Sequence, residues 1–338
     1  MPVTFGRNVK IGIAAEASYL EAWAQPTFGL YHSDLTFDLN IELASDVFAS
    51  GQAQRMLTEI AQGRKDVRFT LRLRAWREQV GTIFKHLLGT VSSSIISAGP
   101  FYKHEFTLNN ASPVSFRIVM QFADVQYQIR GVQIRRMTIP FTPGEWVMIN
   151  LECVGGDFVS AALGTAPTYQ VTTGADEAGF KFVKNDWSIN SVLGWSNLEF
   201  VIENRLADSP DDSYSAAALD AGQSNLVRTR LERASENDPP VSIMLTARKV
   251  RNDNSLFTWF HDFTTFESKY QSGTIGSGEY AFHIEMGVCK VRKHTPLVRG
   301  QSMGMDELLI ESFYSQGTFY SSPSADFRIR LQNKQVSI

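Results

Sequence analysis

The sequence contains little of the chemistry that most enzymes and metal proteins use. Its 338 residues include 2 cysteines and 6 histidines. Cys153 and Cys289 lie far apart in apolar, strand-like segments, so they give neither a disulfide framework nor a metal-ligand spacing. We therefore expect two buried thiols in a reducing compartment.

Long apolar runs and a strong charge of one sign are absent as well. No stretch approaches the roughly 18 uninterrupted apolar residues of a membrane-spanning helix, and residues 1–10 lack the apolar core of a secretion signal. The formal net charge is −3, which is too mild for a dedicated nucleic-acid-binding domain. We expect a soluble protein that is made in the cytoplasm and does not insert into membranes.

Strand patterns dominate what is present. Residues 35–43 alternate apolar and polar side chains, and so do residues 69–75, which lead into a helical pattern at residues 80–88. From residue 101 onward, short turns join several further strand patterns. Short turns connect antiparallel strands, so the sequence predicts a mainly β fold with flanking helices. Residues 56–61 are expected to form a short helix or an ordered loop.

The same order of elements occurs twice along the chain. Residues 196–200 (Ser-Asn-Leu-Glu-Phe) echo residues 33–37 (Ser-Asp-Leu-Thr-Phe). Three further echoes follow in the same order: 241–266 with 68–89, 287–288 with 131–132, and 308–317 with 147–156. We therefore predict an internal duplication.

The duplication divides the chain into two tandem antiparallel β-sandwich or barrel-forming units, each with one packed α-helix. The expected parts are a first unit at residues 1–156, a connector at 157–190, and a second unit at 191–338 that contains a long loop at 207–240. A loop of that length is unusual in a compact fold. We expect it to contact a partner.

The search for catalytic chemistry begins with Ser302, which lies in a G-x-S-x-G sequence. A hydrolase nucleophile elbow needs a preceding buried strand, a following helix and a later histidine. No histidine follows Ser302, so we interpret this segment as a hairpin loop.

Two other motifs also lack the residues that would complete them. Gly273, Gly276 and Gly278 fit neither the dinucleotide nor the P-loop spacing and are expected to be turn glycines. His283 and Glu285 match half of a zinc deaminase signature without the Pro-Cys-x-x-Cys half, so we expect a cross-strand polar pair. The sequence predicts no catalytic residue, no cofactor, no metal site and no enzyme.

The polar faces of the predicted strands are the remaining candidates for function. Asp38 and Glu42 in the first unit, and Glu199 and Glu203 in the second, stand opposite strongly apolar faces. Two interpretations remain open at this point: a solvated outer face of an antiparallel sheet, or a face that lines a water-filled channel made by several subunits.

The element order resembles a known protein family. A Val9-Lys10-Ile11-Gly12-Ile13 segment with Glu16 and Tyr19 precedes the alternating strand and a long insertion. A strand leading to one helix, a His104-Glu105-Phe106 strand and a run of hairpins ending at Gly155-Gly156 follow. This order resembles the tail tube proteins of long, non-contractile-tailed bacteriophages, in the tandem-duplicated form that assembles as trimeric, pseudo-hexameric rings.

The resemblance implies a structural protein of the virion tail, made in the host bacterial cytoplasm. Its copies would form homotrimeric rings with a shared β-barrel, stacked into a tube through which DNA passes without specific binding. Other tail proteins would meet the tube ends. Asp38, Glu42, Glu199 and Glu203 would then face the lumen. The alternative from another class is a carbohydrate-binding or adhesin-like β-sandwich, with Trp146, Trp187 and Trp195 exposed on one face.

Overall fold

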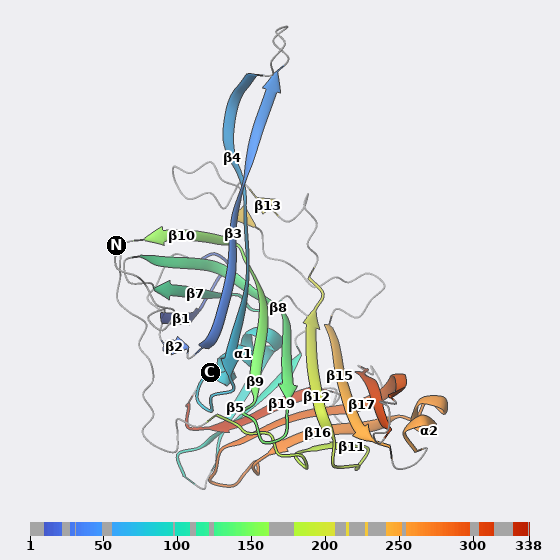
Figure 1. Ribbon diagram of the computed structural model, residues 1–338. Helices are drawn as coiled ribbons and strands as arrows, with labels where there is room; N and C mark the ends of the chain where they lie inside the picture. Colours follow the sequence, from blue (N-terminus) through green and yellow to red (C-terminus); the bar gives the residue numbers. More distant parts are fainter. Residues whose placement is uncertain are drawn as a thin grey trace.

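The computed structural model covers the strands and helices of both halves of the chain. The described residues are 10–21, 28–30, 32–48, 56–96, 99–108, 113–121, 125–161, 179–206, 214–215, 227–228, 241–251, 255–297, 304–313, 327–336 and 338. The fold is mainly β, and every strand pair in this part of the chain is antiparallel (Figure 1).

The elements of the first half are β1 Lys10–Ala15, β2 Phe28–Leu30, β3 His32–Phe48, β4 Met56–Arg74, α1 Val80–Leu88, β5 Gly89–Ile95, β6 Tyr102–Leu108, β7 Phe116–Gln121, β8 Gln126–Phe141, β9 Met148–Gly155 and β10 Asp157–Ala161. Those of the second half are β11 Trp187–Ile189, β12 Ser196–Asn204, β13 Tyr214–Ser215, β14 Val227–Arg228, β15 Val241–Val250, α2 Ser255–His261, β16 Phe266–Ser272, β17 Ala281–Leu297, β18 Met305–Ser312 and β19 Phe327–Asn333.

One continuous sheet runs through both halves in the order β3, β4, β9, β8, β12, β15, β18, β17, and we call it the long sheet. Its core face buries apolar side chains such as Leu71, Leu151 and Phe200, while its polar face carries residues such as Thr70 and Glu152. This alternation is the two-residue period of a sheet that is packed on one side. The predicted strand at residues 69–75 is therefore confirmed.

Strands β8 and β17 each belong to two layers. The second part of β8 lies in the long sheet, and its first part pairs with β7 and β10. In the same way, the second part of β17 pairs with β18 in the long sheet, and its first part pairs with β16 and β19. β6 of the first half pairs with β19, so the two halves also share their second layer.

The strand pairings of the first half recur in the second half in the same order. In the first half β4 pairs with β3 and β9, β8 pairs with β9, β7 and β10, and β7 pairs with β1. In the second half β15 pairs with β12 and β18, β17 pairs with β18, β16 and β19, and β16 pairs with β11. α1 follows β4, and α2 follows its counterpart β15.

Rows of opposing residues across the long sheet fix which positions correspond. One row runs through Phe37, Phe69, Cys153 and Ile134, and its counterpart runs through Phe200, Leu245, Ile310 and Val291. Directly after Ile134 and after Val291, the ladder has a bulge, at Arg135 and Arg292. The two bulges support the alignment independently of the rows.

This alignment agrees with one sequence echo and shifts the others. Phe37 corresponds to Phe200, as the echo of residues 33–37 with 196–200 predicts. The other three echoes identify corresponding elements but not the register. Cys153, for example, corresponds to Ile310 rather than to a residue further along. Because apolar residues recur at every second position, an alignment shifted by two residues fits the alternating pattern equally well. The pattern alone therefore cannot fix the register.

Residues 56–66 belong to strand β4, so the expectation of a helix or ordered loop at 56–61 is wrong. Here β4 pairs with β3 from Phe48 to Leu39 and with no other described strand. Figure 1 shows this end of the β3–β4 hairpin projecting beyond the other strands, and we call it the arm. Cross-strand pairing outweighs local helical spacing here, because a short apolar run fits either period.

The N-terminal segment after β1 packs on two glycines of the first half. The backbone N–H of Gly131 donates to Glu16 Oε1 at 2.8 Å. Gly131 has a φ of +63°, and a Cβ there would lie 2.7 Å from the Tyr19 ring. Gly156 lies under the same ring. Glu16 and Tyr19 therefore have a structural role.

Helix α1 has the predicted apolar stripe and ends at Gly89, whose left-handed φ of 95° terminates the helix. Val80, Ile83, Phe84 and Leu87 are buried. His86 is also buried, and its Nδ1 lies 3.2 Å from the carbonyl oxygen of Val114. Burial lowers the pKa of His86 to about 4, against a smaller raising effect of that carbonyl.

This pKa predicts acid destabilisation. Because the folded pKa of His86 lies below its unfolded value, the unfolded chain binds more protons at acidic pH, and stability falls as pH drops from about 6.5 to 4. We expect His86 to contribute a loss of about 3 kcal/mol over that window. In His86→Gln the free energy of unfolding should fall less steeply with acid, as measured by urea titrations between pH 7 and 4.5. His261→Gln, at an exposed position, should keep the wild-type slope, and an unchanged slope in His86→Gln would contradict the assignment.

Helix α2 covers β17 as α1 covers β8. Leu256, Phe257, Phe260 and Phe263 occur at helical spacing in the sequence, which predicts that they face the core. Leu256 and Trp259 are buried, whereas Phe257 and Phe263 are exposed. The helix ends at His261, and Phe263 adopts a positive φ of 50° beyond it. Neither α1 nor α2, the helices of the described residues, is long and apolar enough to cross a membrane.

Candidate assembly interface

The long sheet ends in two strands that have a free side. In the described part of the chain β3 pairs with β4 alone, and residues 290–297 of β17 pair with β18 alone. We call β3 the acidic edge and residues 290–297 the basic edge, for the charges given below. An unpaired edge exposes a row of backbone N–H and C=O groups that can pair with another chain.

In the centre of the long sheet, a strand of the first half is paired with a strand of the second half. β8 of the first half and β12 of the second half form an antiparallel ladder that we call the internal seam. Val201 lies opposite Thr138, and Glu203 lies opposite Arg136. This seam joins the last long-sheet strand of one half to the first strand of the other.

The alignment of the two halves relates the free edges to this seam. β3 is the counterpart of β12, and the basic edge is the counterpart of the paired part of β8. Asp38 thus corresponds to Val201, and Thr295 to Thr138. The chain therefore contains this junction once in paired form, at the internal seam. In the described part of the chain, the two strand edges that could form the same junction with another copy are unpaired, one at each end of the long sheet.

The free edges carry opposite charge. β3 contains Asp34, Asp38, Glu42 and Asp46 and no lysine or arginine. The basic edge contains Lys290, Arg292 and Lys293 and no acidic residue. Opposite charges on facing strands favour pairing, and like charges oppose it. The charges therefore favour β3 against the basic edge and oppose either edge against itself.

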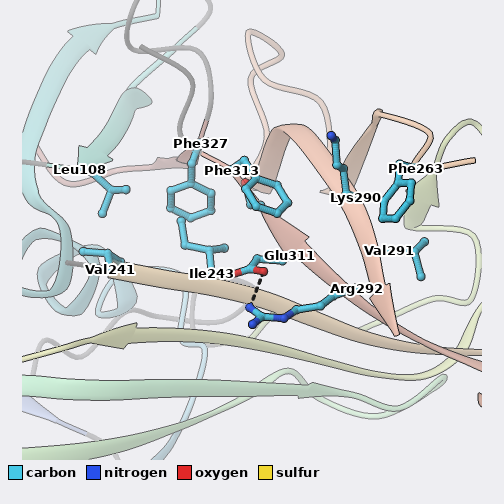
Figure 2. A pocket seen from close by; sticks show the side chains of 11 residues that line it. Leu108, Val241, Ile243, Phe263, Lys290, Val291, Arg292, Glu311, Phe313 and Phe327 are labelled. Carbon is cyan, nitrogen blue, oxygen red and sulfur yellow. Dashed lines mark hydrogen bonds and ion pairs between the residues drawn. The ribbon is translucent and has the colours of Figure 1, made fainter. Parts of the chain in front are cut away.

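A cavity of about 610 Å³ lies beside the basic edge (Figure 2). Its lining is mostly apolar: Leu108, Val241, Ile243, Phe263, Val291, Phe313 and Phe327, with Lys290, Arg292, Glu311 and Ser312. Within it Arg292 Nη1 lies 2.7 Å from Glu311 Oε2. Figure 2 shows this ion pair at one side of the cavity, with the phenylalanine rings at the other. We call this cavity the edge pocket.

The four candidate lumen residues lie on two strands of the long sheet. Asp38 and Glu42 are in β3, where the structure describes the backbone but not these side chains. On β12 Glu199 is exposed and Glu203 is partly buried. Their assignment to a lumen stays a prediction.

The polar face that bears these residues has both signs of charge. Arg248 Nε lies 2.6 Å from Glu307 Oε2, and Arg136 Nη1 lies 3.9 Å from Glu152 Oε1. At these pairs the cations of the polar face are compensated by neighbouring carboxylates.

The residues set aside as catalytic or metal candidates fall into structural roles where they are described. His283 Nε2 donates to the carbonyl oxygen of Gly273 at 2.9 Å, and Glu285 forms cross-strand ion pairs with Arg328 and Arg330. The cross-strand polar pair is thus confirmed. Gly273 and Gly276 have positive φ in the β16–β17 turn, as predicted. Ser302 lies outside the described residues.

The cysteines are buried thiols, as the sequence predicts. Burial raises the pKa of Cys289 to about 12 and raises that of Cys153 as well. Within the described ranges, no group of three or more His, Cys, Asp or Glu side chains could hold a metal ion.

The aromatic face expected of a carbohydrate-binding module does not exist as predicted. Trp187 and Trp195 are fully buried in the core. Trp146 is partly covered by Arg74 and Lys181, whose cations lie 4.5 Å from its ring centroid. The three residues therefore cannot form one exposed sugar-stacking surface.

Sequence reasoning missed the basic edge and the edge pocket. The Lys290-Val-Arg292-Lys293 run was a readable signal, because three cations without an acid are unusual in so mixed a sequence. The pocket had no sequence signal, since it depends on the register of several strands. No protein-family model matches the chain, and no curated protein matches it significantly.

Proposed function

We propose that the protein is a structural subunit that assembles by joining the acidic edge of one copy to the basic edge of the next. The observation that carries the proposal is the internal seam, which is the same junction already made once within the chain. Repetition of one junction between identical copies closes a ring when its rotation closes. A closed barrel also removes the exposed strand edges.

We propose further that each chain is a tandem duplication of one β-sandwich unit with one helix. The repeated pairing order and the matched bulges at Arg135 and Arg292 support this. Three chains would then supply six equivalent units per ring. The expected biological assembly is the tail tube of a long, non-contractile-tailed bacteriophage: stacked rings in the virion, made in the host cytoplasm and met by other tail proteins at the tube ends.

The polar face suits a DNA passage. Each phosphate that a protein neutralises adds salt-sensitive affinity, so a wall that conducts DNA should offer few uncompensated cations. Ion pairs such as Arg248–Glu307 compensate cations on this face. No observation favours a catalytic or sugar-binding function over this one.

A disulfide across the proposed junction tests the assembly. The alignment places Asp38 of one copy opposite Thr295 of the next, where directly opposed Cβ atoms lie about 4.5–5.5 Å apart. Asp38→Cys with Thr295→Cys should give covalent oligomers on mild oxidation, and negative-stain microscopy should show rings or hollow tubes. Both native cysteines are buried and should not interfere.

The matched control moves one cysteine to the internal seam. Glu199→Cys with Thr295→Cys should give no oligomers, because Glu199 already faces Pro140 within its own chain. Dispersed monomers at high concentration, together with no cross-link in the Asp38/Thr295 variant, would refute the proposed function.

A further inference from the structure

The internal seam is closed at one end by a single buried side chain. The Asn204 amide donates to the carbonyl oxygen of Leu87 at 3.3 Å and to that of Ile134 at 2.9 Å. Asn204 is fully buried. The last residue of β12 thus anchors the second half to both the end of α1 and the bulge of β8.

The counterparts of these anchoring positions lie at the edge pocket. Val291 corresponds to Ile134, and it lines the pocket. Phe263 follows α2 with positive φ, as Gly89 follows α1 two residues after Leu87, and Phe263 also lines the pocket. The edge pocket of the second half therefore corresponds to the site that Asn204 fills beside the first half.

The same alignment identifies the counterpart of Asn204 itself. Asn204 lies four residues after Phe200 and opposite Val241 in β15. Ile41 lies four residues after Phe37 and opposite Lys65 in β4, so it holds the matching position. We propose that the edge pocket receives the middle of β3 of a second copy, with Ile41 as the inserted residue. This inference rests on the proposed junction and adds a specific socket to it.

The chemistry of the pocket fits this occupant. Asn204 contacts two backbone carbonyl oxygens, whereas the edge pocket presents the side chains of Phe263, Val291 and Phe313. In the single chain Phe263 is 69% exposed and Phe313 is 42% exposed. Burial of apolar surface contributes roughly 25 cal/mol per Å², so an isoleucine suits this lining better than an amide. The cavity volume of about 610 Å³ exceeds the volume of one isoleucine side chain, and β3 continues past Ile41 to Phe48.

Photocrosslinking tests the socket directly. A photoreactive phenylalanine at position 41 should, on irradiation of assembled full-length protein, give a covalent dimer. Mass spectrometry should place the crosslink on peptides that contain Phe263, Val291 or Phe313 of the other copy. The control carries the same group at position 36, whose side chain lies on the polar face, and should not label those peptides.

A second variant tests the pocket without changing β3. Ser312→Trp should fill the pocket and lower the amount of assembled protein at least about tenfold while the monomer still unfolds in one cooperative transition. Ser312→Ala loses the same hydrogen bond between Ser312 and Cys289 but leaves the pocket open, and it should assemble normally. If the Asp38/Thr295 disulfide forms but position 41 labels other peptides, the socket is wrong and the edge junction stands. If neither forms, both proposals fail.

Discussion

Replacing Lys293 and Thr295 with glutamate should abolish assembly while leaving the chain folded. Both side chains lie on the basic edge outside any ion pair of the described residues. In the proposed junction Thr295 faces Asp38, so the substitution places two carboxylates opposite each other. Like charges directly opposite across strands are destabilising, and their long-range repulsion slows the encounter of copies. Light scattering should show monomers, with wild-type circular dichroism.

The complementary change should restore assembly. Asp38→Lys with Glu42→Lys is expected to prevent assembly alone, since it removes the net negative charge of β3 and places two cations on the strand that faces the basic edge. Combined in one chain with Lys293→Glu and Thr295→Glu, it should give rings again, because the lysine introduced at position 38 then faces the glutamate introduced at position 295. Assembly by either double variant alone would contradict the role of edge charge.

Mixing the two double variants gives a sharper readout of symmetry. The double variant of β3 carries introduced lysines on β3 beside an unchanged basic edge, and the double variant of the basic edge carries introduced glutamates there beside an unchanged β3. Each variant is therefore expected to join to the other and not to itself, so that copies alternate. A ring of three cannot alternate, whereas an even ring can. We therefore expect open chains from the mixture, and closed rings would show an even number of copies. The variant Glu199→Lys, on the polar face away from both edges, serves as the control and should assemble.

Phe84→Ala should be the most destabilising single truncation, with a cost of about 3–5 kcal/mol. Phe84 is fully buried on α1, and its ring centroid lies 5.7 Å from that of Phe106 and 5.4 Å from that of Phe282. It thus packs the first half against β17 of the second half. Denaturant titration should show the loss, and Phe257→Ala, at a 46% exposed position of α2, should change stability by less than about 1 kcal/mol.

The same variant reports how the halves unfold. Because Phe84 contacts both halves, we expect wild type and Phe84→Ala each to unfold in one transition, shifted as a whole. Two separated transitions in calorimetry would contradict the packing of the halves as one cooperative body.

The sequence predicted the elements better than their alignment. Alternation at Phe69 and Leu71 and the helical stripe at Phe84 identified β4 and α1, because each has one strongly apolar face. The arm was mispredicted, since residues 56–61 become a strand only by pairing with β3. In α2 the prediction favoured Phe257, whereas the structure buries Trp259, which lies on the same face as Leu256 three residues earlier.

The candidate interface was only half visible in the sequence. Asp38 and Glu42 attracted attention as polar residues on an apolar strand. Their relation to Lys293 required the internal seam, which joins β8 and β12 from different halves. Such long-range pairing depends on the register of several strands, and a period of two residues leaves that register open.

The pairing of β6 with β19 has a consequence for the timing of synthesis. β19 is the last strand of the described residues, and it lies between β17 and β6. Domains begin to fold from the N-terminus during synthesis, but β6, which pairs with β5 on one side, meets its partner on the other side only when residues 327–333 have been made. The second layer of the first half is therefore completed by the last described strand of the second half.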